Sequence, residues 1–307
     1  MRLKGALDFR HICDSGAKWL TGLSVLCIAA ILALLIGNII YFGWERLTWS
    51  FLTEAPSNGM TGGGVFPAIF GTVALVFLMT VFVVPAGVVV AIYFSEYADR
   101  ASWFYRVSRQ AVNNIAGVPS IVFGLFGLGF FVQHVGGSMD RILHSGQPVW
   151  GRPSLIWAAL TLAVLTLPVV VISVEEALQA VPRSHREAGY ALGATRSQVV
   201  LRVVLPHAIP GVLTGSILAV SRAAGEVAPI LFVGAAYYLP QIPTHLNDQF
   251  MHLGYHVFIL STQAPDPDAV KPILYSTVLV LLALTFILNT AAIIIRARMR
   301  AARRSAS

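Results

Sequence analysis

Charged residues are scarce in this chain. Only 11% of its 307 residues are Asp, Glu, Lys or Arg, whereas a typical soluble domain has about 25%. So few charges cannot cover the surface of a soluble protein of this size, and a hydrophobic share of 56% excludes intrinsic disorder. The net charge of +7 would be typical of a nucleic-acid-binding protein, so the positions of the basic residues decide between the classes.

Motifs for catalysis and for ATP binding are missing. The three lysines are Lys4, Lys18 and Lys271, and none follows a glycine, so the chain has no Walker A loop. Neither Gly-x-Ser-x-Gly nor His-Glu-x-x-His occurs. The two cysteines, Cys13 and Cys27, lie near and within the first apolar run, where we expect neither a disulfide nor a metal site. The sequence therefore predicts a protein that is not an enzyme and has no catalytic residue, metal or bound cofactor of its own.

Long stretches without charge are what the chain does have, and each is long enough to cross a bilayer. They predict six membrane helices, at residues 19–44, Val65–Phe94, 110–139, 153–174, Ile209–Ala235 and 272–295. The first run is longer than a signal-peptide core and no cleavage site follows it, so we expect a retained helix. The predicted fold is an all-α polytopic membrane protein, with an N-terminus at 1–18, a first helix and external loop at 19–64, a five-helix core at 65–295 and a basic tail at 296–307.

The basic residues gather on one side of these predicted helices. That side holds 16 of the 21, among them Lys18 and the arginines of the tail 296–307, whereas the other side holds four and Arg222 lies within a span. Lysine and arginine concentrate in cytoplasmic loops, so we expect both termini in the cytoplasm. The positive net charge is therefore a signal of topology, and nucleic acid is not an expected partner.

Two charges, Arg222 and Glu226, lie within the fifth predicted helix. Residues four apart in a helix share nearly one face, and charges at bilayer depth are costly and usually pair or line a cavity. Pro229 leaves the carbonyl of Gly225 without its usual donor, so we expect a weakened, kinked helix here. One interpretation is a structural ion pair that locks the bundle. We favour a substrate pathway, because a guanidinium offers a rigid fork of donors to phosphate or carboxylate oxygens.

The fourth loop is basic and unusually organised. Ser184–Glu187 and Thr195–Gln198 each fit the pattern of a helix capping box, and Gly193 separates them. We expect two short helices joined by a sharp turn. Their apolar residues would either rest on the membrane surface or insert into a groove of a partner protein; these residues are Ala188, Ala191, Leu192, Val199, Val200 and Val203.

The same loop resembles the EAA loop of ABC importer permeases. The matching pattern is Glu187-Ala-Gly, three residues, Gly193, nine residues, then Val203-x-Leu-Pro206, with Gly189 in place of the second Ala and Val203 in place of Ile. In that family the loop is the coupling helix that docks into the ATPase subunit. The resemblance implies the type I ABC importer permease fold, with a cytoplasmic coupling loop at residues 183–206. It implies ATPase contacts at Glu187, Ala188, Gly189, Gly193, Leu205 and Pro206.

Two further stretches, Asn114–Gly129 and Ser221–Leu231, are similar to phosphate-specific ABC permeases, and the second is closer to their A-type subunit. This implies a permease subunit of an ATP-driven importer of inorganic phosphate in a bacterial plasma membrane, with Arg222 and Glu226 on the phosphate path. The implied partners are a C-type sister permease, two ATPase subunits that bind ATP and Mg, and an external phosphate-binding protein. Another oxyanion, such as phosphonate or molybdate, is an alternative cargo; an intramembrane enzyme or sensor is a third interpretation, which the missing catalytic motifs disfavour.

The longest external loop, Tyr237–Lys271, is expected to be partly helical around Gln249–Leu260. It would serve as a docking surface for an outside partner or as an interfacial lid. Within it, His252 and His256 are spaced for one helix face, which fits either a metal site or, as we prefer, an amphipathic stretch at the interface. Elsewhere Pro85, Pro119 and Pro168 are expected to kink membrane helices. The small pairs Ser120/Gly124 and Gly211/Gly215 are expected to let helices pack closely.

Overall fold

The computed structural model describes the backbone of residues 2–264 and 266–304, and the side chains of residues 16–264 and 266–299. Met1 and residues 305–307 of the two predicted terminal segments lie outside the described residues. The described chain is mostly helical, which confirms the all-α prediction. The α-helices are α1 (Arg2–Gly43), α2 (Trp49–Thr53), α3 (Phe66–Ile92), α4 (Trp103–Ile115), α5 (Ser120–Phe126), α6 (Gly137–Leu143), α7 (Leu155–Gln179), α8 (Arg183–Ala191), α9 (Arg196–Val199), α10 (Leu205–Ala223), α11 (Leu253–Thr262) and α12 (Pro267–Arg304).

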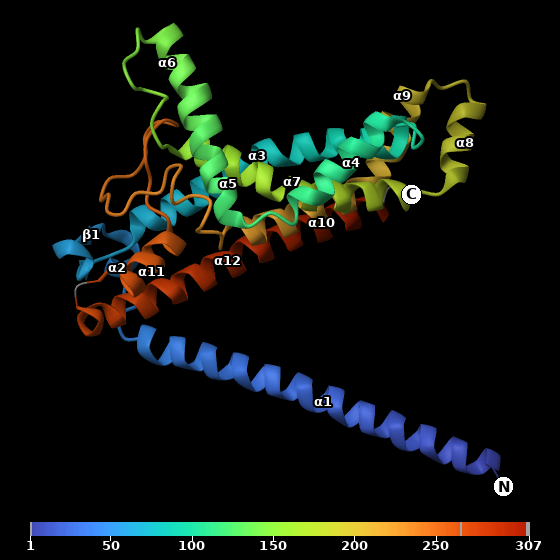
Figure 1. Ribbon diagram of the computed structural model, residues 1–307, viewed down its shortest axis with the longest axis horizontal. Coiled ribbons are helices and arrows are strands. Elements are labelled where there is room, and N and C mark those ends of the chain that lie inside the picture. Colours follow the sequence, from blue (N-terminus) through green and yellow to red (C-terminus); the bar gives the residue numbers. More distant parts are fainter. Residues whose placement is uncertain (1, 265, 305–307) are drawn as a thin grey trace.

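Short irregular elements join some of these helices. Three π-helical segments, η2 (Tyr93–Tyr97), η3 (Gly127–Gly136) and η4 (Val200–Val204), extend or link longer helices, and a 3-10 turn, η1, covers Asn58–Met60. The one sheet within the described residues is a hairpin of β1 (Pro56–Ser57) and β2 (Gly62–Gly63). Figure 1 shows α8 and α9 at one end of the bundle, here called the α8 end, and α2, β1 and α11 at the other, here called the α11 end.

Six helical segments of the described chain are long and apolar enough to cross a membrane, as predicted. They are Gly16–Gly43, Phe66–Tyr97, Ser120–Leu143, Leu155–Gln179, Arg196–Ala223 and Pro267–Met299. Helices are the natural solution here, because a lipid-exposed backbone must satisfy its hydrogen bonds internally.

The third span begins later than predicted. Residues 103–115 form the separate helix α4, and the chain turns before Pro119, which is extended and precedes α5. A proline disfavours helical geometry in the residue before it, so Pro119 starts a helix and the prediction that it kinks one was wrong. Pro85 and Pro168 do lie inside helices, α3 and α7.

Helices α3, α7 and α10 form the centre of the bundle, and small residues let them approach closely. A Cβ on Gly87 of α3 would lie 2.5 Å from a methyl group of Val170 in α7. On α10, Gly215 faces Ser173 of α7 in the same way and Gly211 faces Ala177, so the predicted close packing of this pair is confirmed.

Helix α1 stands apart from this bundle. In Figure 1 it leaves the α11 end as a separate arm. Its C-terminal end packs on α12, where Ser276 donates a 2.7 Å hydrogen bond to the carbonyl of Gly43. Among the residues described, none in the most apolar stretch of Gly16–Gly43 is buried. This chain alone therefore leaves the arm's apolar surface uncovered.

Candidate functional site

The charged pair lies where α10 ends. Arg222 belongs to the last turn of α10 and Glu226 to the turn after it, and Nε of Arg222 donates to Oε1 of Glu226 at 3.2 Å. The Arg222 side chain is 46% exposed and that of Glu226 20% exposed. The pair is therefore not sealed inside the bundle of this chain, and the other guanidinium nitrogens have no partner among the described residues.

The prediction of one helix through Ile209–Ala235 was wrong at its C-terminal end. Residues 224–234 form successive turns, so Gly225 and Pro229 lie beyond the helix and do not kink it. Pro229 cannot donate a backbone hydrogen bond and restrains the residue before it, which stops a helix from passing through. The turns pack against α5, because a Cβ on Gly124 would lie 2.9 Å from the carbonyl oxygen of Pro229.

The polar end of α10 is also fastened to α12. Nδ2 of Asn289 donates to Oγ of Ser221 at 3.0 Å, next to Arg222 in the chain. A hydrogen bond between two membrane helices holds their relative rotation. Packing of the turns on α5, packing of α10 on α7 and this contact with α12 therefore hold the backbone that carries Arg222.

The coupling loop, residues 183–206, forms α8, a turn, and the first part of a long helix. The end of α8 has the hydrogen bonds of a Schellman motif: the amide of Gly193 donates to the carbonyl of Tyr190, and that of Ala194 to Gly189. Gly193 has a φ of +81°, which costs a glycine little and other residues much. The predicted sharp turn between two helices is therefore present, and its backbone conformation favours glycine.

Only one of the two predicted capping boxes forms. At α9, Thr195 and Gln198 bond each other's backbone as expected. At α8, the residue before the helix is Pro182 and no side-chain cap is present, so the box predicted at Ser184–Glu187 was wrong. Ser184 lies inside the first turn of α8, where its hydroxyl no longer occupies the cap position.

The two halves of the coupling loop turn different faces outward. Glu187, Ala188 and Ala191 are exposed, and Leu192 is 89% exposed. Val199 and Val200 are buried instead, and Gly189 lies so close to Val199 that a Cβ would come within 3.0 Å of it. The surface available to a partner protein is therefore that of α8, while α9 anchors it.

Leu205 and Pro206 lie away from this surface, at the start of α10 and half-buried. They follow α9 and η4 without a break, and residues 196–223 form one helical run. The coupling loop and Arg222 thus occupy opposite ends of a single helix, which the sequence prediction of a separate second short helix did not foresee.

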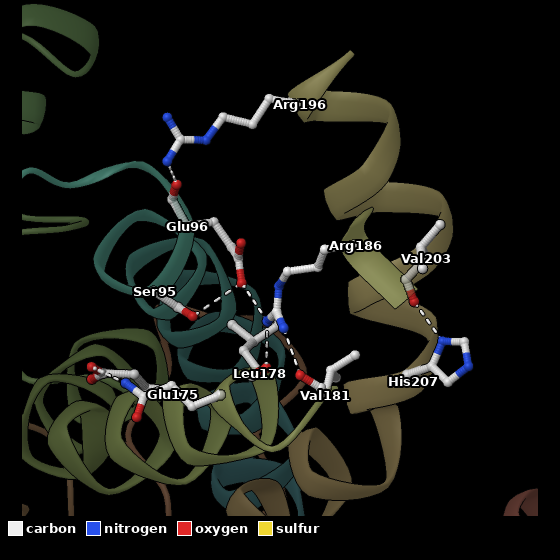
Figure 2. Close-up of polar contacts among 10 residues, drawn as sticks. Ser95, Glu96, Glu175, Leu178, Val181, Arg186, Arg196, Val203 and His207 are labelled. Carbon is white, nitrogen blue, oxygen red and sulfur yellow. Dashed lines mark hydrogen bonds and ion pairs between the residues drawn. The ribbon is translucent and has the colours of Figure 1, made fainter. Parts of the chain in front are cut away.

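A polar network that the sequence did not reveal joins α8 and α9 to the rest of the α8 end. Arg186 of α8 donates to Oε1 of Glu96 at 3.0 Å and to the carbonyls of Leu178 and Val181 at 2.8 and 2.5 Å. Figure 2 shows these contacts as dashed lines. Arg196 of α9 donates to the backbone carbonyl of Glu96 and lies over the Tyr97 ring. The Glu96 partners are 90 and 100 residues away in the chain, so no local pattern could have paired them.

A second ion pair lies beside the first. Arg109 of α4 bonds Glu175 of α7, which also accepts from Gln179 at 3.0 Å. Glu175 is buried. A buried carboxylate must be paired to remain charged, and this one holds α4 against α7.

At the α11 end, His252 and His256 are buried, so the prediction of an interfacial amphipathic stretch was wrong. His256 lies in α11, which starts at Leu253 rather than 249. His252 is the N-cap residue of that helix, and its Nδ1 accepts a hydrogen bond from the amide of Gly254. Within the described side chains, no three His, Cys, Asp or Glu residues are grouped to hold a metal. Burial lowers the pKa of both histidines from 6.5 to about 4.

These histidines predict a loss of stability in mild acid. The unfolded chain binds protons as the pH falls through about 6.5, whereas the folded chain binds them only near pH 4, so stability decreases across that interval. We expect a lower unfolding temperature at pH 5 than at pH 7.5, and a weaker pH dependence in His256→Leu. In the control His245→Leu, whose side chain is 75% exposed, the dependence should persist. Equal unfolding temperatures at the two pH values would contradict the prediction.

Comparison with known proteins identifies the family and supports the fold. The family model described as binding-protein-dependent transport system inner membrane component matches residues 83–301. The probable ABC transporter permease protein YqgI of Bacillus subtilis is 33% identical over 274 residues, which cover 85% of this chain and 87% of that protein. The phosphate transport system permease protein PstA 1 of Mycobacterium tuberculosis is 31% identical over 294 residues, covering 94% and 90%.

A bacterial alginate ABC transporter, solved in complex with an alginate pentasaccharide-bound periplasmic protein, has a chain of the same fold. The TM-score is 0.64 at 16% identity, and the match covers 91% of this chain and 94% of that one. The helical fold and these similarities define a multi-pass membrane permease, not an enzyme. The chain belongs to the family of binding-protein-dependent transport system inner membrane components, which confirms the resemblance to ABC importer permeases.

Proposed function

We propose that this chain is the A-type permease subunit of an ATP-driven importer of inorganic phosphate, with Arg222 and Glu226 on the phosphate path. The similarity to PstA 1 over nearly the whole chain supports phosphate as cargo. The exposed guanidinium of Arg222 supports an anion, because its planar donors match phosphate oxygens. Glu226 keeps the unoccupied site from being an unpaired cation and makes anion binding reversible by competition.

The observation that carries the proposal is the single helical run of residues 196–223. Its first turns belong to the coupling loop and its last turn carries Arg222. The run is continuous, and although η4 and Pro210 interrupt its regular hydrogen bonding, a displacement at α9 would be transmitted along it toward Arg222. ATP binding and hydrolysis on a separate ATPase would act on α8 and α9 and alter the access of phosphate to Arg222. Glu187, Ala188, Gly189 and Gly193 would form the ATPase contact, and Leu205 and Pro206 would link it to the membrane helix.

The uncovered apolar surface of α1 supports the proposal of a sister permease as partner. Large apolar side chains such as Trp19 and Leu34 are 82% and 75% exposed, and the arm's own chain covers none of its apolar stretch. A C-type subunit would bury one side of the arm, and lipid the rest. Two such subunits would bring two coupling loops to two ATPase chains.

A hollow at the α11 end supports the proposal of an external phosphate-binding protein as a further partner. Residues 239–249 surround a hollow of about 950 Å³ with Arg152 and Asp248 on its wall. The turn beneath is rigid, because the Asp248 carboxylate accepts backbone hydrogen bonds from Thr244 and His245, which hold its pKa below the usual value. With the basic α8 end in the cytoplasm, this hollow would face outward and both termini inward.

The cargo can be tested by complementation. In bacterial cells that lack high-affinity phosphate uptake, we expect this chain with its sister permease, ATPase and binding protein to restore uptake of labelled phosphate. A tenfold excess of unlabelled phosphate should compete, and equal phosphonate or molybdate should not. Competition by one of these other oxyanions, with no effect of phosphate, would assign the importer to that anion.

A further inference from the structure

Arg186 joins the coupling helix to the membrane helices. Among the side-chain hydrogen bonds of the described residues, those from α8 to α3 and α7 all come from this one arginine. It points inward, with 18% of its side chain exposed, while Glu187, Ala188 and Leu192 face outward. The inward contacts of α8 are therefore separate from the surface that an ATPase would grip.

The partners of Arg186 lie at the ends of two membrane helices. Leu178 and Val181 are at the C-terminal end of α7, where carbonyls lack donors within the helix and a cation is favoured by the helix dipole. Glu96 follows α3 in the π-helical segment η2, and its side chain is 10% exposed. One guanidinium thus binds the ends of α3 and α7 together.

Arg196 adds a second attachment from the other side of the Gly193 turn. It bonds the backbone carbonyl of Glu96 and lies 5.0 Å from the centre of the Tyr97 ring. Figure 2 shows Arg186 and Arg196 approaching Glu96 from two different helices of the coupling loop. The segment around Glu96 is consequently held by both α8 and α9.

We propose that Arg186, Glu96 and Arg196 form a clamp through which movement of the coupling loop is transmitted to α3 and α7. Because α3 and α7 pack against α10, the clamp moves the bundle around Arg222 as one body. These are positioning residues, which touch no substrate. The inference rests on the proposed function, since it names the contacts that link ATPase docking to transport.

The clamp predicts uncoupling without loss of docking. We would assemble the full transporter in proteoliposomes with wild-type chain, Arg186→Gln, Glu96→Gln or both changes. ATPase retention and the rate of ATP hydrolysis should change less than about twofold, while phosphate moved per ATP should fall about tenfold, within the usual range of coupling between sites. The double variant should match Arg186→Gln, because that single change already breaks the contact with Glu96. Arg106→Gln is the matched control, since it removes an exposed arginine of α4, outside the coupling loop, and should keep the wild-type ratio.

Each other result overturns the clamp. A wild-type ratio of phosphate to ATP in Arg186→Gln would show that the contact does not transmit movement, and loss of the ATPase would make Arg186 a docking residue. If Arg186→Gln does not assemble, Arg196→Gln provides the test, because it breaks the second attachment. A wild-type ratio of phosphate to ATP in Arg196→Gln would reject the clamp. Absence of phosphate uptake by the wild-type assembly would instead overturn the proposed function, and the clamp with it.

Discussion

Arg222→Gln is expected to lower phosphate uptake by about 10- to 100-fold, because losing a hydrogen bond to a charged group costs about 1.5–3 kcal/mol and 1.4 kcal/mol corresponds to tenfold. The effect has two parts. Glutamine offers no positive charge to the anion, and Glu226, at 3.2 Å from Arg222 in the structure, remains as an unpaired carboxylate that repels it. Uptake of labelled phosphate measures the effect, and co-purification of the ATPase shows that assembly is intact.

A charge-neutral control separates the pathway from a structural ion pair. If the pair only locks the bundle, the double variant Arg222→Gln/Glu226→Gln should recover, because no buried charge is left without its partner. A phosphate path predicts that the double variant stays defective, since the anion still lacks its guanidinium. Arg222→Lys should fall between, because lysine keeps the charge without the planar fork. Recovery of the double variant would contradict the pathway.

Gly193→Val is expected to weaken docking of the ATPase by about 5- to 150-fold, because a β-branched residue at positive φ costs about 1–3 kcal/mol. The φ of Gly193 is +81°, and the Schellman hydrogen bonds from residues 193 and 194 depend on that geometry. Loss of the turn would release the end of α8, together with the exposed Leu192. The amount of ATPase that co-purifies with the chain measures this change.

Gly193→Asn is the matched control for the turn. Asparagine tolerates the left-handed region far better than valine, and position 193 is open enough for a side chain, since no atom lies within 4 Å of the place that a Cβ would occupy. We therefore expect Gly193→Asn to retain most of the ATPase. Equal retention by the valine and asparagine variants would show that the backbone conformation of the turn is not what docking requires.

The spans and the coupling loop were predictable because their signals are local. Long uncharged stretches indicated the six membrane helices, and the glycine between two short helices indicated the turn at Gly193, which the structure confirms. The end of the fifth span was missed because hydropathy continues through Ala235, although the helix itself ends at Ala223. Hydropathy therefore locates a membrane span, but it does not fix the residue at which the helix ends.

Tertiary contacts of the candidate site could not be predicted from a single sequence. The cap at Ser184 failed because the chain enters α8 two residues earlier, with Pro182 at the cap position, and a local pattern does not fix that entry. Glu96 and Arg186 come together only because α3 and α7 end side by side at the α8 end. By contrast, Arg222 and Glu226 stayed paired although the helix ends between them, since four residues of turn still bring the side chains within reach.

ATP-driven accumulation of labelled phosphate in proteoliposomes tests the central claim most directly. The vesicles would contain this chain, its sister permease and the ATPase pair, with ATP on the ATPase side and loaded binding protein on the other. The account predicts phosphate accumulation that requires hydrolysable ATP and falls about 10- to 100-fold in Arg222→Gln although the ATPase remains bound. Accumulation that is equal in Arg222→Gln, or absent from the wild-type assembly while ATP is hydrolysed, would contradict it.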